Sequence, residues 1–68
     1  MDTHNIDRVM CALYRARTMK RSELYKQYIA IGGELSSRDF FKTIRRWYDC
    51  REYRNGKGYW MIAFGGAI

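Results

Sequence analysis

The chain has 68 residues, of which 47% are hydrophobic and 16% aromatic. That length suits one domain with a small core, and the apolar content excludes an intrinsically disordered protein. Thirteen Lys and Arg against seven Asp and Glu give a formal net charge of +6. The surplus favours a polyanionic partner, although a generally basic, well-hydrated surface is the plainer interpretation.

Cysteine and histidine are sparse, with Cys11, Cys50 and His4 spread far apart along the chain. Their spacing is not that of a zinc site. The polar N-terminus is not followed by the apolar run of a signal peptide, and no stretch approaches the roughly 20 apolar residues of a membrane span. We therefore expect a single domain over 1–68, cytoplasmic with reduced thiols, without metal, cofactor or membrane contact.

The first predicted helix covers about residues 5–17. Cys11 falls on its polar side, which indicates either a subunit contact or a partly exposed thiol. The apolar residues of this helix have the i, i+3, i+4, i+7 spacing of one face: Ile6, Val9, Met10 and Leu13.

A second helix is predicted over about 22–31. Ser22 is a typical N-cap, and Glu23 suits the positive end of the helix dipole. Gly32 stands where a left-handed residue ends a helix. Residues 18–21 are interpreted as extended.

The third predicted helix, about 37–50, has an aromatic inner face and a basic outer face. Ser36 and Asp39 have the spacing of a capping box. The inner face contains Phe40, Phe41, Ile44, Trp47 and Tyr48. The outer face contains Arg38, Lys42, Arg45 and Arg46, with Asp49 among them.

Residues of about 51–64 are predicted to form a β-hairpin. Asn55-Gly56 tolerates the positive φ values of a tight turn, and the segment after the turn is rich in β-forming residues. Arg54 and Lys57 flank the turn and make the tip of the hairpin basic.

Three helices followed by a hairpin, with the most basic face on the third helix, resemble the winged helix-turn-helix. The segment LYKQYIAIGGELSSRDFFKTIRRW resembles the helix 2–helix 3 region of winged helices in viral and phage primase-helicases and in RFX-type transcription factors. Their recognition helix begins with an "lS-x-R-x-F" pattern, here Leu35, Ser36, Arg38 and Phe40 or Phe41. The resemblance covers about residues 6–64. It implies an α+β, mainly α fold and a small phage-type regulator, without the ATPase activity of the primase-helicases.

A winged helix of this kind would contact DNA with helix 3 and the wing. The major groove admits one α-helix, and arginine can form two parallel hydrogen bonds to guanine. We expect helix 3 to reach bases and backbone, while the wing tip and the residues before helix 2 meet phosphates. The predicted DNA-binding residues are Ser37, Arg38, Lys42, Arg45, Arg46, Arg54, Lys57, Lys20 and Arg21.

These assignments have plainer alternatives. The basic face of helix 3 can be a solvated surface, and the wing cations can be charges that protect a β-edge from pairing. Asp39 suits helix capping better than accepting a hydrogen bond from a cytosine amino group. Trp47 and Trp60 would be able to stack on bases, but their spacing favours a place in the core.

The sequence contains no Ser-His-acid or Cys-His set and no phosphate loop, so we do not expect an enzyme. The predicted function is double-stranded DNA binding by a transcriptional regulator of phage or mobile-element origin, as a monomer or a homodimer. The main alternative is a winged-helix inhibitor that docks on a host protein complex such as a polymerase or a defence nuclease. A third is an architectural protein that binds nucleic acid without sequence preference.

Overall fold

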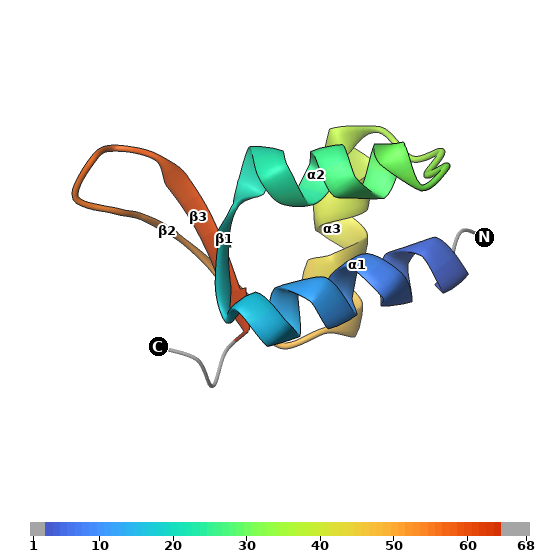
Figure 1. Ribbon diagram of the computed structural model, residues 1–68, viewed down its shortest axis with the longest axis horizontal. Helices are drawn as coiled ribbons and strands as arrows, with labels where there is room; N and C mark the ends of the chain where they lie inside the picture. The colour runs from blue at the N-terminus through green and yellow to red at the C-terminus, as the bar shows by residue number, and fades with distance from the viewer. Residues whose placement is uncertain (1–2, 65–68) are drawn as a thin grey trace.

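The computed structural model describes residues 3–64; the remaining residues of the predicted domain, 1–2 and 65–68, lie outside the described residues. Of the described residues, 56% are helical and 21% lie in strands. In Figure 1 the hairpin β2–β3 projects beyond the three helices, and α3 crosses behind α1 and α2. The elements are α1 (Thr3–Ala16), β1 (Thr18–Lys20), α2 (Arg21–Ala30), α3 (Ser37–Trp47), β2 (Cys50–Arg54) and β3 (Trp60–Phe64).

The three strands form one antiparallel sheet in the order β1-β3-β2. Met19 of β1 and Glu52 of β2 both pair with Ile62 of the central strand β3. Of the stretch 18–21 predicted to be extended, residues 18–20 form a strand and Arg21 already belongs to α2. The predicted C-terminal hairpin is confirmed. The chain has an α+β, winged-helix layout, with three helices and a C-terminal hairpin as the wing.

The core lies where the helices meet the base of the sheet. The apolar stripe predicted for the first helix is buried as expected. The rings of Tyr28 in α2 and Phe40 in α3 stack with their centroids 4.4 Å apart, which joins these two helices. The buried cluster comprises Ile6, Val9, Met10, Leu13, Leu24, Tyr28, Phe40, Phe41, Ile44 and Ile62.

The turn after α2 fixes the position at which α3 begins. Gly32 has φ +99°, which confirms the predicted left-handed residue. Its N–H donates to the carbonyl of Ile29, and the N–H of Gly33 donates to the carbonyl of Tyr28, so the helix ends in a Schellman motif. The Tyr28 hydroxyl also accepts from the N–H groups of Glu34 and Leu35, at 3.1 and 2.9 Å. A core side chain thus holds the chain that leads into α3.

The predicted bounds need correction at several helix ends. The first helix spans Thr3–Ala16 instead of 5–17, and Arg17 leaves it with φ +70°. Ser22 is not an N-cap: β1 continues directly into α2, so Lys20, which pairs with Met61, occupies the cap position without a side-chain cap. These are shifts of one or two residues, the usual uncertainty of helix ends.

The third helix ends at Trp47, three residues before the predicted end at about residue 50. Tyr48 is already extended, with φ −128° and ψ 147°, and β2 begins at Cys50 rather than at 51. Pairing of Cys50 with Phe64 explains the early exit, because the backbone hydrogen bonds of these residues go to the sheet.

The hairpin turn also differs from the prediction. Gly58, with φ +86°, is the left-handed residue of the turn, and Asn55-Gly56 has no positive φ. The Gly58 N–H donates to the Asn55 carbonyl, and the side chain of Asn55 accepts from the N–H groups of Lys57 and Tyr59. This is the three-residue loop in which a type I turn is followed by a left-handed glycine.

Candidate functional site

Helix α3 is held by its apolar side and presents its cations to solvent. Phe40, Phe41 and Ile44 are buried, and the Ser36 hydroxyl accepts from the Asp39 N–H at 3.2 Å, which confirms the predicted cap. The predicted outer face is also confirmed, because its cations are all exposed. They are Arg38, Lys42, Arg45 and Arg46.

A carboxylate from the wing lies between two of the predicted site residues. Glu52 of β2 has one carboxylate oxygen 3.6 Å from Arg21 Nε and the other 3.8 Å from Arg45 Nη1. Both separations exceed hydrogen-bond length, so these are ion pairs without directional bonds. Glu52 thereby connects the start of α2, α3 and the wing, and it offsets part of the charge of both arginines.

The outer half of the wing continues the helix-facing side of the sheet. Side chains alternate between faces along a strand, so Trp60 and its cross-strand partner Arg54 lie on the same face as Ile62. Ile62 is buried, but Trp60 is 48% exposed. The Arg54 guanidinium lies 5.5 Å from the centroid of the Trp60 ring.

A groove of about 490 Å³ lies between the start of α2, the start of α3 and the wing. Three cations line it, and Tyr59 and Trp60 supply the wing side. Lys20 Nζ lies 4.0 Å from the centroid of the Tyr59 ring. The lining residues are Lys20, Arg21, Ser22, Tyr25, Lys26, Ser37, Phe41, Tyr59 and Trp60.

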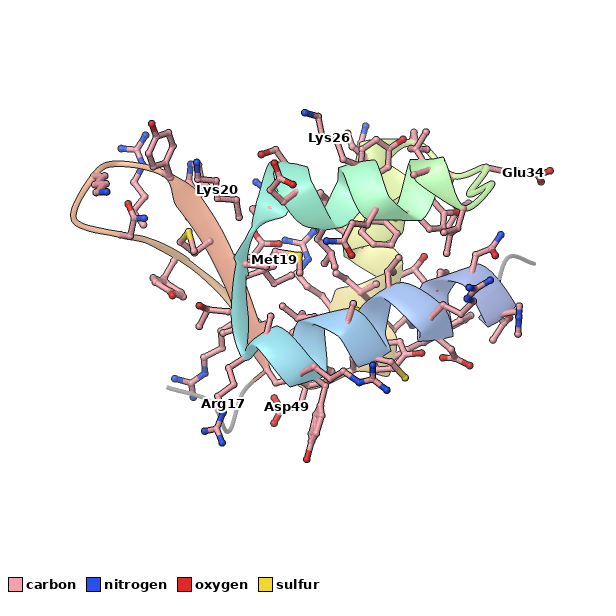
Figure 2. The ribbon with its side chains drawn as sticks, viewed as in Figure 1. Arg17, Met19, Lys20, Lys26, Glu34 and Asp49 are labelled. Carbon is pink, nitrogen blue, oxygen red and sulfur yellow. The ribbon has the colours of Figure 1, made fainter. Side chains whose placement is uncertain are left out.

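None of the residues that line the groove is acidic, and Glu52 offsets only Arg21 among its three cations. Figure 2 shows Lys20 beside the wing and Lys26 on the outer side of α2. It places Glu34 at the end of the molecule away from the wing, and Asp49 at the lower edge of the view, below α1. Cations therefore gather around the groove, while these two carboxylates lie elsewhere.

The predicted core positions of Trp47 and Trp60 are wrong. Trp47 is 43% exposed and Trp60 is 48% exposed. Trp47 is the last residue of α3, at the point where the chain leaves the helix. Trp60 is the first residue of β3, next to the hairpin turn, and it lines the groove instead of entering the core.

The structure brings the predicted site residues together only in part. Lys20, Arg21 and Ser37 line the groove, and Arg54 contacts Trp60, which also lines it. Arg38, Lys42 and Arg46 are exposed on α3 outside the groove lining, and Lys57 is exposed in the wing turn. The groove residues that sequence reasoning did not assign to the site are Ser22, Tyr25, Lys26, Phe41, Tyr59 and Trp60.

The two thiols have different surroundings. Cys11 is exposed on α1. Burial raises the pKa of the Cys50 thiol, and the nearby carboxylates of Glu52 and Asp49 add to the effect while Arg45 opposes it. The Cys50 sulfur lies 3.6 Å from the Ile44 carbonyl, to which the thiol donates.

Within residues 3–64, no cluster of three or more His, Cys, Asp or Glu side chains is arranged to hold a metal ion. Over the same residues, the helices are too short or too polar to cross a bilayer. Neither a protein-family model, nor a curated protein, nor a solved structure matches this chain.

Proposed function

We infer that the protein binds double-stranded DNA, with α3 in the major groove and the wing on the adjoining backbone. The observation that carries this proposal is the two-sided character of α3. Phe40, Phe41 and Ile44 pack into the core and anchor the helix, and its four cations are all exposed to solvent. A recognition helix needs this combination, because side chains reach base edges reliably only from a fixed backbone.

The wing supports the same assignment. Arg54 and Lys57 lie at or next to the hairpin turn, and both are exposed. Cations on the wing suit the phosphates that border the major groove of DNA. Arg38, near the start of α3, suits base edges. We propose a transcriptional regulator of phage or mobile-element type as the setting for this activity, without catalysis.

Paired charge-removal variants test the proposal. Replacing Arg38 and Arg46 by Ala in α3 removes two charges, as does replacing Arg8 and Arg15 by Ala on the exposed side of α1. Each base-contacting arginine is worth about 1–3 kcal/mol, so the α3 variant is expected to bind a selected duplex at least about tenfold more weakly than the α1 variant. Fluorescence anisotropy over a salt series measures both affinities.

Two results would contradict the proposal. Equal weakening by the α1 and α3 variants would show that only net charge matters, and the assignment of α3 would fail. An absence of salt-dependent binding to any duplex by the unaltered protein would refute DNA binding and favour the host-protein inhibitor.

A further inference from the structure

The groove beside α3 combines three cations with two exposed ring systems, which is more than duplex binding requires. We propose that this groove binds unpaired nucleotides of a strand that adjoins the duplex held by α3. This inference rests on the proposed function, because that function supplies the duplex held by α3. The protein would then prefer a junction between double-stranded and single-stranded DNA to a blunt duplex.

Charge is the first reason for this choice of ligand. Lys20, Arg21 and Lys26 line the groove, and no acidic side chain does. Glu52 offsets Arg21, but no carboxylate of residues 3–64 forms an ion pair with Lys20 or Lys26. These ammonium groups are therefore available to a backbone of phosphates, and Ser22 and Ser37 add hydroxyl donors at the starts of two helices.

The rings are the second reason. Tyr59 and Trp60 are 49% and 48% exposed although both are large and apolar. Each has a cation near its ring, Lys20 at 4.0 Å and Arg54 at 5.5 Å from the centroids. A ring that has a cation on one side and is half exposed can receive a base on the other side, as in the stacking platforms of single-strand binding proteins.

The bases must be unpaired to use these rings. In a duplex each base is stacked on its neighbours, and side chains reach only base edges, sugars and phosphates. The groove volume of about 490 Å³ lies in the range of roughly 300–1,000 Å³ typical of small-ligand pockets, which suits an unstacked nucleotide. Ser37 both lines the groove and begins α3, so a strand that leaves the duplex at α3 can enter it directly.

The two exposed tryptophans provide a matched test. Trp47→Phe leaves Trp60, in the groove, as the single tryptophan. Trp60→Phe leaves Trp47, which does not line the groove and is similarly exposed. Titration with an oligothymidylate of about ten nucleotides is expected to quench the tryptophan fluorescence of the first protein and leave that of the second nearly unchanged. Equal quenching in both proteins, or none in either, would overturn the proposal.

Affinity gives a second readout. A duplex with a single-stranded overhang is expected to bind about 5- to 150-fold more tightly than the blunt duplex, which corresponds to roughly 1–3 kcal/mol for one stacked base. Trp60→Ala should abolish that preference, and Trp47→Ala should retain it. If the preference survives in Trp60→Ala, the groove is not the site. If Trp60→Ala is unfolded by circular dichroism, the fluorescence comparison decides alone.

Further titrations identify the ligand of the groove and test this inference separately from the proposed function. An oligouridylate that quenches more strongly than the oligothymidylate would assign the groove to RNA and contradict the DNA junction. Equal quenching by polyglutamate would assign it to acidic protein segments and also contradict the proposal. Oligothymidylate binding without any blunt-duplex binding would refute the proposed function alone, whereas duplex binding with no overhang preference would refute this inference alone.

Discussion

Helices α1 and α3 follow the same pattern and yet offer different surfaces. Both bury an apolar stripe and expose arginines. The depression beside α1 has a volume of about 250 Å³, and Arg8 is its one cation; the rest of its lining is Val9, Gln27, Ala30 and Ile31. The groove beside α3 is about twice as large and has three cations and two exposed rings.

This comparison shows that a basic helix face does not define a site. Arg8 of α1 lies among neutral residues in its depression, whereas the start of α3 borders a groove that is lined by Lys20, Arg21 and Lys26. A polyanion gains from several cations at once, because each neutralised phosphate releases counterions. Convergence of separate elements, more than the formal charge of +6, therefore distinguishes α3.

Removing the anchor of α3 is the largest expected perturbation. Phe40→Ala would delete a fully buried ring that stacks on Tyr28 at 4.4 Å. Such substitutions cost about 3–5 kcal/mol, and a domain of this size rarely has more than about 3–5 kcal/mol in total. We expect Phe40→Ala to be mostly unfolded in urea titrations followed by circular dichroism. Lys42→Ala on the exposed side is the control, and a native-like Phe40→Ala would contradict the role of this ring.

A smaller loss is expected at the turn that positions α3. A Cβ on Gly33 would lie 2.4 Å from the Tyr28 ring, which is fully buried and has little room to move. Gly33→Ala is therefore expected to lower the free energy of unfolding by about 1–3 kcal/mol. Gly56→Ala is the matched control, because its Cβ would meet open space. Similar stability for the two variants would show that the turn does not constrain α3.

A substitution at Glu52 is expected to strengthen the binding of DNA. Glu52→Gln removes the carboxylate shared by Arg21 and Arg45 and leaves both cations for phosphates. The slope of log Kobs for duplex DNA against log salt is expected to steepen by about one unit. Glu23→Gln, an exposed change of the same charge in α2, is the control. If the two variants have the same slope, Glu52 does not restrain these arginines.

The thiols give the smallest effect. Cys11, exposed on α1, should react with iodoacetamide faster than Cys50, whose pKa is raised mainly by burial. The folded protein favours the neutral form of the Cys50 thiol. The stabilisation of the folded state by this thiol is therefore fully present below the ordinary thiol pKa of about 8.5, and it is lost as the pH rises through the raised pKa of the folded protein. Mass spectrometry of the labelled protein over an alkaline pH series measures both rates. Faster labelling of Cys50 would contradict its half-buried position.

Much of the fold could be predicted from local sequence. The spacing of Ile6, Val9, Met10 and Leu13 was sufficient to identify the buried face of α1, and Gly32 marked the end of α2. These signals work because periodicity and capping depend on neighbouring residues alone. The exit of the chain at Trp47 was not predictable in this way, because it depends on pairing of Cys50 with a residue on another strand.

The site was predictable only where it lies on one element. The amphipathic pattern identified the cations of α3, but Lys26, Tyr59 and Trp60 join the groove through tertiary packing. Alternation along β3 places Trp60 on the same face as Ile62, but it carries no information on where the sheet projects past the helices. Likewise, no spacing in the sequence indicates that Glu52 lies between Arg21 and Arg45.

The most direct test of the account follows backbone amide signals by heteronuclear NMR while duplex DNA is added. We expect the largest early shifts at residues 37–46 and 54–60, with the signals of residues 6–15 in α1 little changed. Shifts concentrated in α1, with those of α3 and the wing unaffected, would contradict the claim that α3 and the wing together form the DNA-binding surface.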